Sequence, residues 1–305
     1  MKKIISVLTA GVLAFSLAAC GKKSDSNTIK IAYLPITHSL AVLETADELA
    51  AQTGLQVELV KYGSWNELMD ALNSGRVDGA SVLIELAMKS KEQGIGLKAV
   101  ALGHKDGNVI ITSPDIASAE DLKGKTIAIP HRQSSHNILL NDALATAGLT
   151  IDDINVTELA PTEMPSALAG GQIDGYCVAE PFGAKAVSLG AGKVLFTSEE
   201  LWEDSLCCGL VLTDKFIEER ESDAKTFVES YKQAGKNLTK EQAMKTATKY
   251  LNQEKDVLEL SLQWISYDDL EITEENYSTL TEKVRAYGLS ENPPSYADFV
   301  INDFE

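Results

Sequence analysis

Strands and helices alternate along the chain, and this alternation restricts the fold more than any other feature. Residues 29–34 have the β-rich pattern of a strand, 35–38 interrupt it, and 39–53 have the pattern of a helix ended by Gly54. A second strand is predicted over 56–62, and Ser64 with Glu67 forms a capping-box pattern for a helix over 65–74. Because such alternation is typical of parallel sheets with right-handed crossovers, we predict an α/β fold.

The same pattern occurs twice. Residues 75–79 (GRVDG) and 170–175 (GGQIDG) each follow a helix that ends in Ala-Leu and precede a short strand, which indicates a diverged internal duplication. We therefore predict two lobes, one formed by 29–108 together with 209–305 and the other by 109–208. The predominantly helical segment after Asp214 is expected to pack on the first lobe. Two crossing strands between the lobes would make a hinge, with a cleft beside it.

The first residues have the pattern of an export signal. A short basic start, an apolar run over 4–17 and the sequence Leu17-Ala18-Ala19-Cys20 predict a signal peptide over 1–19. The run is shorter than the roughly 20 residues that a spanning helix needs. Leu-Ala-Ala-Cys resembles the bacterial lipobox, so we expect Cys20 to be lipidated. Residues 20–28 would then form a tether that holds the protein at the outer face of the cell membrane. The alternative is cleavage at Ala19 without lipidation.

Charge restricts the class of partner. The chain has 45 Asp and Glu against 27 Lys and Arg, for a formal net charge of -18. Nothing in it resembles a basic stripe, so a nucleic-acid partner is not expected. Any anionic ligand would have to be held by local donors.

Three cysteines remain beyond Cys20. They are Cys177, Cys207 and Cys208, and adjacent cysteines rarely form a disulfide because the ring is strained. The vicinal pair with a nearby His can bind a soft metal, but the spacing matches no zinc site, and small side chains packed in a buried strand are the preferred interpretation. We expect neither a metal nor a cofactor.

Several motifs together resemble a known family. They are the segments 33–38 (YLPITH), 65–72 (WNELMDAL), 75–80 (GRVDGA), 134–136 (SSH) and 174–182 (DGYCVAEPF). In this order and spacing they resemble the substrate-binding lipoproteins of ABC importers, most closely the nitrate/sulfonate/bicarbonate (taurine-like) group. The resemblance covers about residues 29–215. It implies a type II periplasmic-binding-protein fold that closes on a small solute and delivers it to an ABC permease with its ATPase, as a monomer.

Candidate ligand-binding residues lie in the loops at strand ends, where ligands of open α/β sheets bind. Hydroxyls and amides at 134–136 bind the oxoanion in the resembled family, although Ser134 or Ser135 can equally cap a helix. Other roles are open for several of these residues. Thr37 can cap a helix, Trp65 can be a core residue, and His38 and Arg132 can be exposed to solvent without a ligand. For Glu180 the alternative is a carboxylate paired with solvent. Glu85 departs from what an anion site prefers and leaves a cationic or zwitterionic ligand open. The predicted ligand-binding residues are Thr37, His38, Trp65, Ser81, Asn108, His131, Arg132, Ser134, Ser135, His136 and Glu180.

Catalysis has little support in the sequence. The carboxylates, His and Ser have the spacing of neither a nucleophile elbow, a two-His zinc helix nor a phosphate-binding glycine loop, so we do not expect an enzyme. The predicted function is capture of a small solute, expected to be a nitrate-, sulfonate- or bicarbonate-type anion, for an ABC permease. A thiamine-pathway pyrimidine or other organic solute, and a ligand-sensing lipoprotein, are the alternatives.

Overall fold

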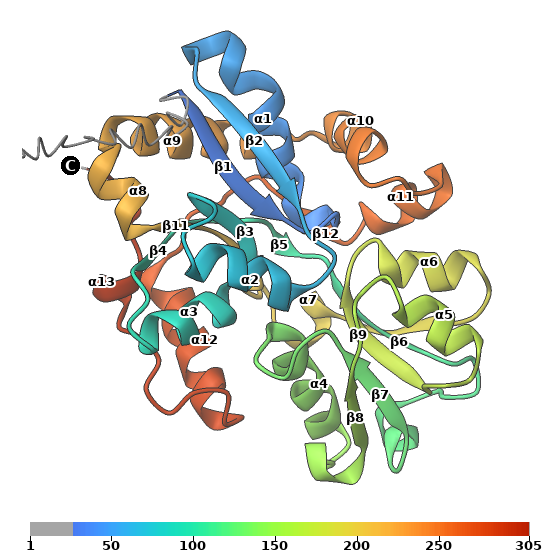
Figure 1. Cartoon of the computed structure of the whole chain (residues 1–305). Helices are drawn as coiled ribbons and strands as arrows, with labels where there is room; N and C mark the ends of the chain where they lie inside the picture. Colours follow the sequence, from blue (N-terminus) through green and yellow to red (C-terminus); the bar gives the residue numbers. More distant parts are fainter. Residues whose placement is uncertain (1–26, 305) are drawn as a thin grey trace, which may run out of the picture.

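Two five-stranded sheets form the framework of the protein (Figure 1). The computed structural model describes residues 27–304, so the predicted signal peptide, Cys20 and most of the tether lie outside the described residues. The first sheet has the order β2-β1-β3-β11-β4, in which only β11 is antiparallel to its neighbours. Its strands are β1 (Thr28–Tyr33), β2 (Gln56–Lys61), β3 (Gly79–Leu83), β4 (Leu97–Leu102) and β11 (Cys208–Thr213).

The second sheet repeats this plan. Its order is β10-β6-β9-β7-β8, and here β6 is the strand antiparallel to its neighbours. Its strands are β6 (Asn108–Thr112), β7 (Thr126–Ile129), β8 (Asn155–Glu158), β9 (Gly175–Ala179) and β10 (Lys193–Thr197). We call each sheet with the helices around it a lobe. The α/β class predicted from the sequence is confirmed.

The two GxxDG segments, 75–79 and 171–175, have the same structural role in both lobes. The Asp78 carboxylate accepts a 2.8 Å hydrogen bond from the amide of Lys30 in β1, and Asp174 accepts one of 2.8 Å from the amide of Thr126 in β7. The glycine that follows each aspartate starts a strand, where a Cβ would lie 2.7 Å from a neighbouring carbonyl oxygen. A carboxylate and a glycine at these places thus dock a short strand beside its neighbour, which explains the repeated pattern.

The chain crosses twice between the sheets. It leaves the first sheet after β4, passes through β5 (Lys105–Asp106) and enters the second sheet at β6. It returns from β10 through α7 (Ser198–Leu201) to β11. The crossings meet where the Gly103 amide donates a 2.7 Å hydrogen bond to the Cys208 carbonyl. A glycine is required there, because a Cβ on Gly103 would lie 2.9 Å from the His38 carbonyl oxygen.

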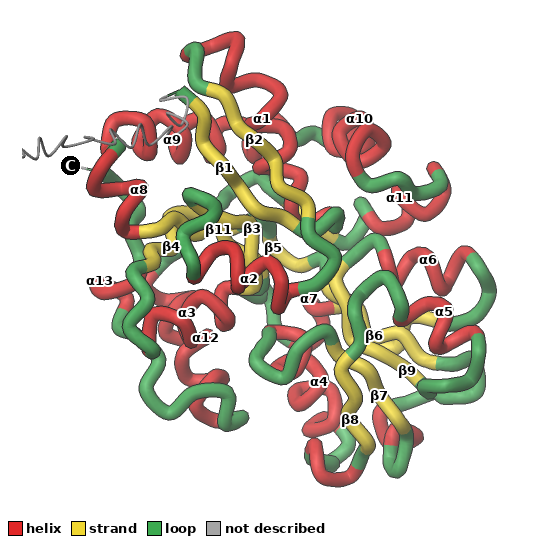
Figure 2. The backbone as a smooth tube through the Cα atoms, in the orientation of Figure 1, coloured by secondary structure: helices red, strands yellow, loops and turns green. Residues whose placement is uncertain are grey.

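Helices cover the faces of both sheets (Figure 2). Those of the first lobe are η1 (Thr37–Ser39), α1 (Leu40–Thr53), α2 (Trp65–Asn73) and α3 (Ile84–Glu92). Those of the second lobe are η2 (Ala119–Leu122), α4 (Ser135–Thr146), η3 (Ile151–Asp153), α5 (Met164–Ala169) and α6 (Phe182–Ser188). The predicted cap of α2 is present, because the Glu67 amide donates to the Ser64 hydroxyl. In the part of the chain that the structure describes, no helix has the length and apolarity to cross a bilayer.

The segment after β11 touches both lobes. Its elements are α8 (Asp214–Glu219), α9 (Glu221–Asn237), α10 (Lys240–Tyr250), α11 (Lys255–Ser261), β12 (Ile265–Ser266), α12 (Glu274–Ala286) and α13 (Tyr296–Phe299). Helices α9 and α10 pack on α1, as expected, but α11 contacts α6 of the second lobe. In addition, Lys283 of α12 forms a 2.8 Å ion pair with Asp142 of α4, to which the Tyr287 hydroxyl also donates. The expectation that this segment packs on the first lobe alone was therefore incomplete.

Candidate functional site

The loops predicted to bind ligand meet where the two lobes touch. The amide and hydroxyl of Thr37, in the first lobe, both donate to the carbonyl oxygen of Glu180 in the second, at 2.9 and 3.0 Å. The Tyr267 hydroxyl donates to the Thr37 carbonyl at 2.8 Å. The polar groups of Thr37 are thus used to hold the lobes together. Thr37 makes no side-chain cap, and His38, at 0% exposure, is not the exposed residue that the alternative supposed.

Near this junction, several buried polar side chains of residues 27–304 have atoms without hydrogen-bond partners. Trp65 begins α2, Glu85 lies in the first turn of α3, Asn108 begins β6, and Ser135 and His136 begin α4. All five are 4% exposed or less. Within the described residues, the Trp65 indole N–H, both Glu85 oxygens, the Asn108 amide nitrogen, the Ser135 hydroxyl and both His136 nitrogens have no partner. Buried polar groups are normally paired, so these groups, contributed by both lobes, indicate the place of a bound molecule.

The electrostatics of this group are unusual for an anion site. Burial raises the pKa of Glu85 well above its usual range, and the neighbouring Cys207 adds to the effect. Burial lowers the pKa of His136 to about 4, so its imidazole is neutral at pH 7. Among residues 27–304, no Lys or Arg is buried. Any charge on the bound molecule therefore faces a carboxyl group rather than a buried cation.

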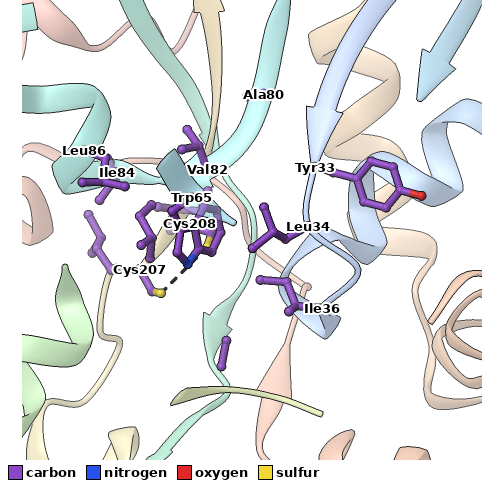
Figure 3. Packing of buried hydrophobic residues seen from close by; sticks show 14 of the residues in the cluster. Tyr33, Leu34, Ile36, Trp65, Ala80, Val82, Ile84, Leu86, Cys207 and Cys208 are labelled. Atoms are coloured by element: carbon purple, nitrogen blue, oxygen red, sulfur yellow. Dashed lines mark hydrogen bonds between the residues drawn. The ribbon is translucent and has the colours of Figure 1, made fainter. Parts of the chain in front are cut away.

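Two histidines and two cysteines form a second cluster at the lobe crossings. His38 follows β1, His104 follows β4, and Cys207 and Cys208 lie where the chain enters β11. All four are buried, and their potential ligand atoms lie within 4.8 Å of one another. Figure 3 draws both cysteines and Trp65 among the buried hydrophobic side chains. The sulfurs are 3.8 Å apart and belong to free thiols.

The histidine rings in this cluster have defined partners. His38 Nε2 lies 2.9 Å from the Gly107 carbonyl and must therefore carry the proton, because a carbonyl can only accept. This leaves the Nδ1 lone pair of His38 facing Cys207 and Cys208 at 3.7 and 3.6 Å. The His104 ring stacks on His38 with centroids 3.5 Å apart.

The protonation of the cluster follows from this packing. Burial, followed by the effect of His38, lowers the pKa of His104 to about 4. Burial opposes ionisation of the Cys207 thiol, but the hydrogen bond from Cys208 holds the pKa of Cys207 well below its usual range. Burial and the adjacent Cys207 raise the pKa of Cys208.

The other predicted residues have different surroundings. The Ser134 hydroxyl donates to the His131 carbonyl at 2.6 Å, and Ser81 pairs with Ser39 at 3.3 Å. Arg132 is exposed, and its guanidinium donates to the Val156 carbonyl, so it supplies no buried contact.

Glu180 and His131 lie in surroundings of different kinds. Glu180 is fully buried and accepts from the Ala184 amide, so the solvent-paired alternative is wrong. His131 lines an outer pocket of about 150 Å³ between the lobes, together with Trp65 and Glu163.

Sequence reasoning names His38, Asn108, Ser135 and His136 as ligand-binding residues, and the structure places them near the lobe junction. It does not indicate that Cys207, Cys208 and His104 lie together with His38. The sequence favours packed side chains for the two cysteines and places His104 only near a lobe junction. The one sequence signal for the cluster was the vicinal cysteine pair, which needs a histidine nearby to become informative.

Comparisons with known proteins agree with this architecture. The sequence model of the NMT1-like family matches residues 22–252. A nitrate import ATP-binding protein, NrtC of Synechocystis sp., is 31% identical over 63% of this chain, which spans 32% of that relative's length.

Two solved structures share the fold. The ligand-binding component of an ABC-type import system from Staphylococcus aureus, with zinc bound, has a TM-score of 0.87 and 42% identity over 90% of this chain and 97% of that one. The alkanesulfonate-binding protein SsuA of Xanthomonas axonopodis pv. citri, bound to MOPS, has a TM-score of 0.76 at 20% identity over 92% of this chain and 100% of that one. The predicted periplasmic-binding-protein fold is confirmed.

Proposed function

Because the chain belongs to the NMT1-like family, we propose that it is the solute-binding component of an ABC importer. It captures one small molecule between its two lobes and presents it to a membrane permease. The observation that carries this proposal is the set of unpartnered buried groups supplied by both lobes, Trp65 and Glu85 from one and Asn108, Ser135 and His136 from the other. A ligand that pairs with groups from both sides favours the closed arrangement, because it makes contacts there that the open state lacks.

The chemistry of the solute is a separate part of the proposal. The sequence led us to expect an oxoanion, and relatives are named for nitrate and alkanesulfonate. The buried surroundings argue for a cation instead: Glu85 is the carboxyl group among the unpartnered groups, and among residues 27–304 no Lys or Arg is buried to balance an anion. Cationic charge beside Glu85 would restore its ionised form. The zinc in the Staphylococcus aureus relative supports the same direction.

The location of the protein follows from its first residues and its relatives. We propose that the segment before Cys20 is removed and that acyl chains on Cys20 hold the protein at the outer face of the membrane, beside its permease. The protein performs no chemistry on its solute in this role. Labelling with a radioactive fatty acid, and its loss in a Cys20→Ala variant, tests the anchor.

Solute capture is tested by thermal unfolding of the protein lacking residues 1–20. Ligands to be compared are nitrate, bicarbonate, taurine, an alkanesulfonate, a thiamine-pathway pyrimidine and divalent transition-metal ions. A true solute at 100 times its Kd stabilises the folded state by about 2.7 kcal/mol, a shift of several degrees in Tm. We expect Glu85→Gln to reduce the shift and the control Glu58→Gln, at an exposed surface pair, to retain it. A Tm shift with an oxoanion alone would overturn the proposal that the solute is a cation. No Tm shift with any class of ligand would overturn the proposed function.

A further inference from the structure

We propose that His38, His104, Cys207 and Cys208 bind one thiophilic divalent cation of the Zn²⁺ class at the point where the two lobe crossings meet. This deepens the proposed function by naming the class of solute, and to that extent it rests on that function. The coordination itself is argued from the four side chains alone.

The distances within the cluster are those of a tetrahedral site. With Zn–S bonds of about 2.3 Å and Zn–N bonds of about 2.05 Å, tetrahedral angles place two sulfurs about 3.8 Å apart and a sulfur and a nitrogen about 3.6 Å apart. In the protein the two sulfurs are 3.8 Å apart, and His38 Nδ1 is 3.7 and 3.6 Å from them. Three of the four corners therefore already have the spacing that the ion requires.

The hydrogen bonding of the His38 ring is also typical of a histidine that binds a metal. A ligating imidazole usually donates its second N–H to a carbonyl or carboxylate, which fixes the tautomer and orients the free lone pair. His38 does this through the Gly107 carbonyl at 2.9 Å. Gly107 lies on the first crossing between the lobes, so the carbonyl that orients His38 belongs to the same junction as the cysteines.

His104 supplies the fourth corner. The ring is 0% exposed and receives a 3.3 Å hydrogen bond from the Cys208 amide at Nε2, so Nε2 holds the lone pair and the proton of the neutral ring lies on Nδ1. Nε2 is therefore the nitrogen that can coordinate the ion, in place of its long contact with the Cys208 amide. Nδ1, which has no hydrogen-bond partner within residues 27–304, keeps the proton.

A disulfide or a nucleophilic thiol would account for the cluster less well. A disulfide would place the sulfurs at about 2.05 Å, and vicinal pairing strains the ring. A nucleophilic thiol needs one cysteine beside one histidine. Here the single lone pair of His38 faces two sulfurs equally, an arrangement that coordination uses fully and nucleophilic attack does not.

The ligand set also restricts which cation fits. Thiolate and imidazole favour Zn²⁺ and other soft or borderline ions over Mg²⁺ and Ca²⁺, which prefer oxygen ligands. Two thiolates neutralise a divalent charge. Since the four residues come from the start of the chain and from both crossings, binding should favour the arrangement in which these segments are held together.

The test uses Co²⁺ as a spectroscopic substitute for Zn²⁺. The protein lacking residues 1–20 is reduced, freed of metal with a chelator and titrated with Co²⁺ alone, then with Zn²⁺ in competition. We expect one equivalent of Co²⁺ to give thiolate-to-metal charge-transfer and tetrahedral ligand-field bands, and Zn²⁺ to displace it. Mg²⁺ at a hundredfold excess should not. Octahedral bands, or no thiolate band, would overturn the inference without any variant being made.

Matched alanine variants locate the site. Cys207→Ala and Cys208→Ala should each weaken metal binding at least 100-fold and abolish one thiolate contribution. Cys177→Ala, which removes the third buried free thiol, should leave binding within threefold. Equal losses in all three would overturn the assignment. Circular dichroism checks that each variant is folded, and His38→Gln gives a further variant that keeps both thiols.

The outcome also separates this inference from the proposed function. If an organic or anionic solute shifts Tm while Co²⁺ gives no thiolate band, solute capture stands and the metal site is wrong. If Co²⁺ binds through the cysteines but small-angle scattering shows the same dimensions with and without Zn²⁺, the site is present but the ion is not a solute captured by closure, and that part of the inference is wrong.

Discussion

Glu180 should make the stability of the protein fall as pH rises. Its side chain is 0% exposed, and its two oxygens accept only from the Ala184 amide, at 3.2 and 3.0 Å, among the hydrogen bonds of residues 27–304. Burial raises the pKa of Glu180 to about 8, against the opposing Ala184 amide. The unfolded chain ionises near the usual value for Glu, so the folded state binds the extra proton between these two values.

The sign and size follow from proton linkage. Between the unfolded and folded pKa values only the folded state is protonated, so the free energy of unfolding decreases by about 1.4 kcal/mol for each pH unit and becomes level above the folded pKa. From pH 6.5 to 8 this amounts to roughly 2 kcal/mol. At the lower end of that window His104 and His136 contribute with the opposite sign, because their pKa values of about 4 in the folded state lie below the usual 6.5 at which the unfolded chain still releases protons. This contribution is the same in the natural chain and in a Glu180 variant, so it cancels in their difference.

The assay is urea unfolding at several pH values for the natural chain and for Glu180→Gln. Glutamine keeps the shape but does not titrate, so the difference between the two proteins should change by roughly 2 kcal/mol between pH 6.5 and 8 in favour of the variant. The same pH slope in both proteins would refute the reasoning.

Two further perturbations test contacts between distant segments. Asp142→Asn removes the ion pair with Lys283 that joins the two lobes. We expect the fraction of closed protein to fall and the apparent Kd for solute to rise roughly tenfold. An unchanged Kd in isothermal titration would contradict a role of this ion pair in closure. Thr246→Val removes a hydroxyl that donates to the buried Glu44 carboxylate, and should cost about 1–3 kcal/mol in urea unfolding. The exposed control Thr248→Val should cost less, and an equal loss in both would show that the Glu44 contact is not the cause.

The fold was largely predictable from the sequence because its signals are local. Strand alternation and the Ser64 cap depend on residues within a few positions of one another. The repeated aspartate-glycine pattern is also a short sequence motif, although each aspartate accepts its hydrogen bond from a strand 48 residues away. The two crossings could be predicted because a duplicated pattern implies two sheets. The contacts of α11 and α12 with the second lobe could not, since amphipathic helices show that they pack but not on which surface.

The site was predictable in position but not in chemistry. Loops at strand ends gave Asn108, Ser135 and His136, yet Thr37 and Ser134, which have the same residue type and the same kind of loop, use their hydroxyls on backbone carbonyls. Spacing rules for metal sites also give no sign of the contact between Cys207 and His38, because the two residues lie 169 positions apart in the sequence. Only the tertiary fold brings such groups together, so a short-range motif cannot reveal them.

The place of β11 has a consequence for the order in which the chain is assembled. Strands β3 and β4 do not pair with each other; both pair with β11, which the ribosome makes only after the whole second sheet. The second lobe can thus form from one uninterrupted stretch of the chain, whereas the sheet of the first lobe lacks the strand between β3 and β4 until β11 is made. Cys207 and Cys208 lie at the start of β11. During synthesis these thiols therefore reach their final positions only when β11 inserts between β3 and β4 and completes the first sheet.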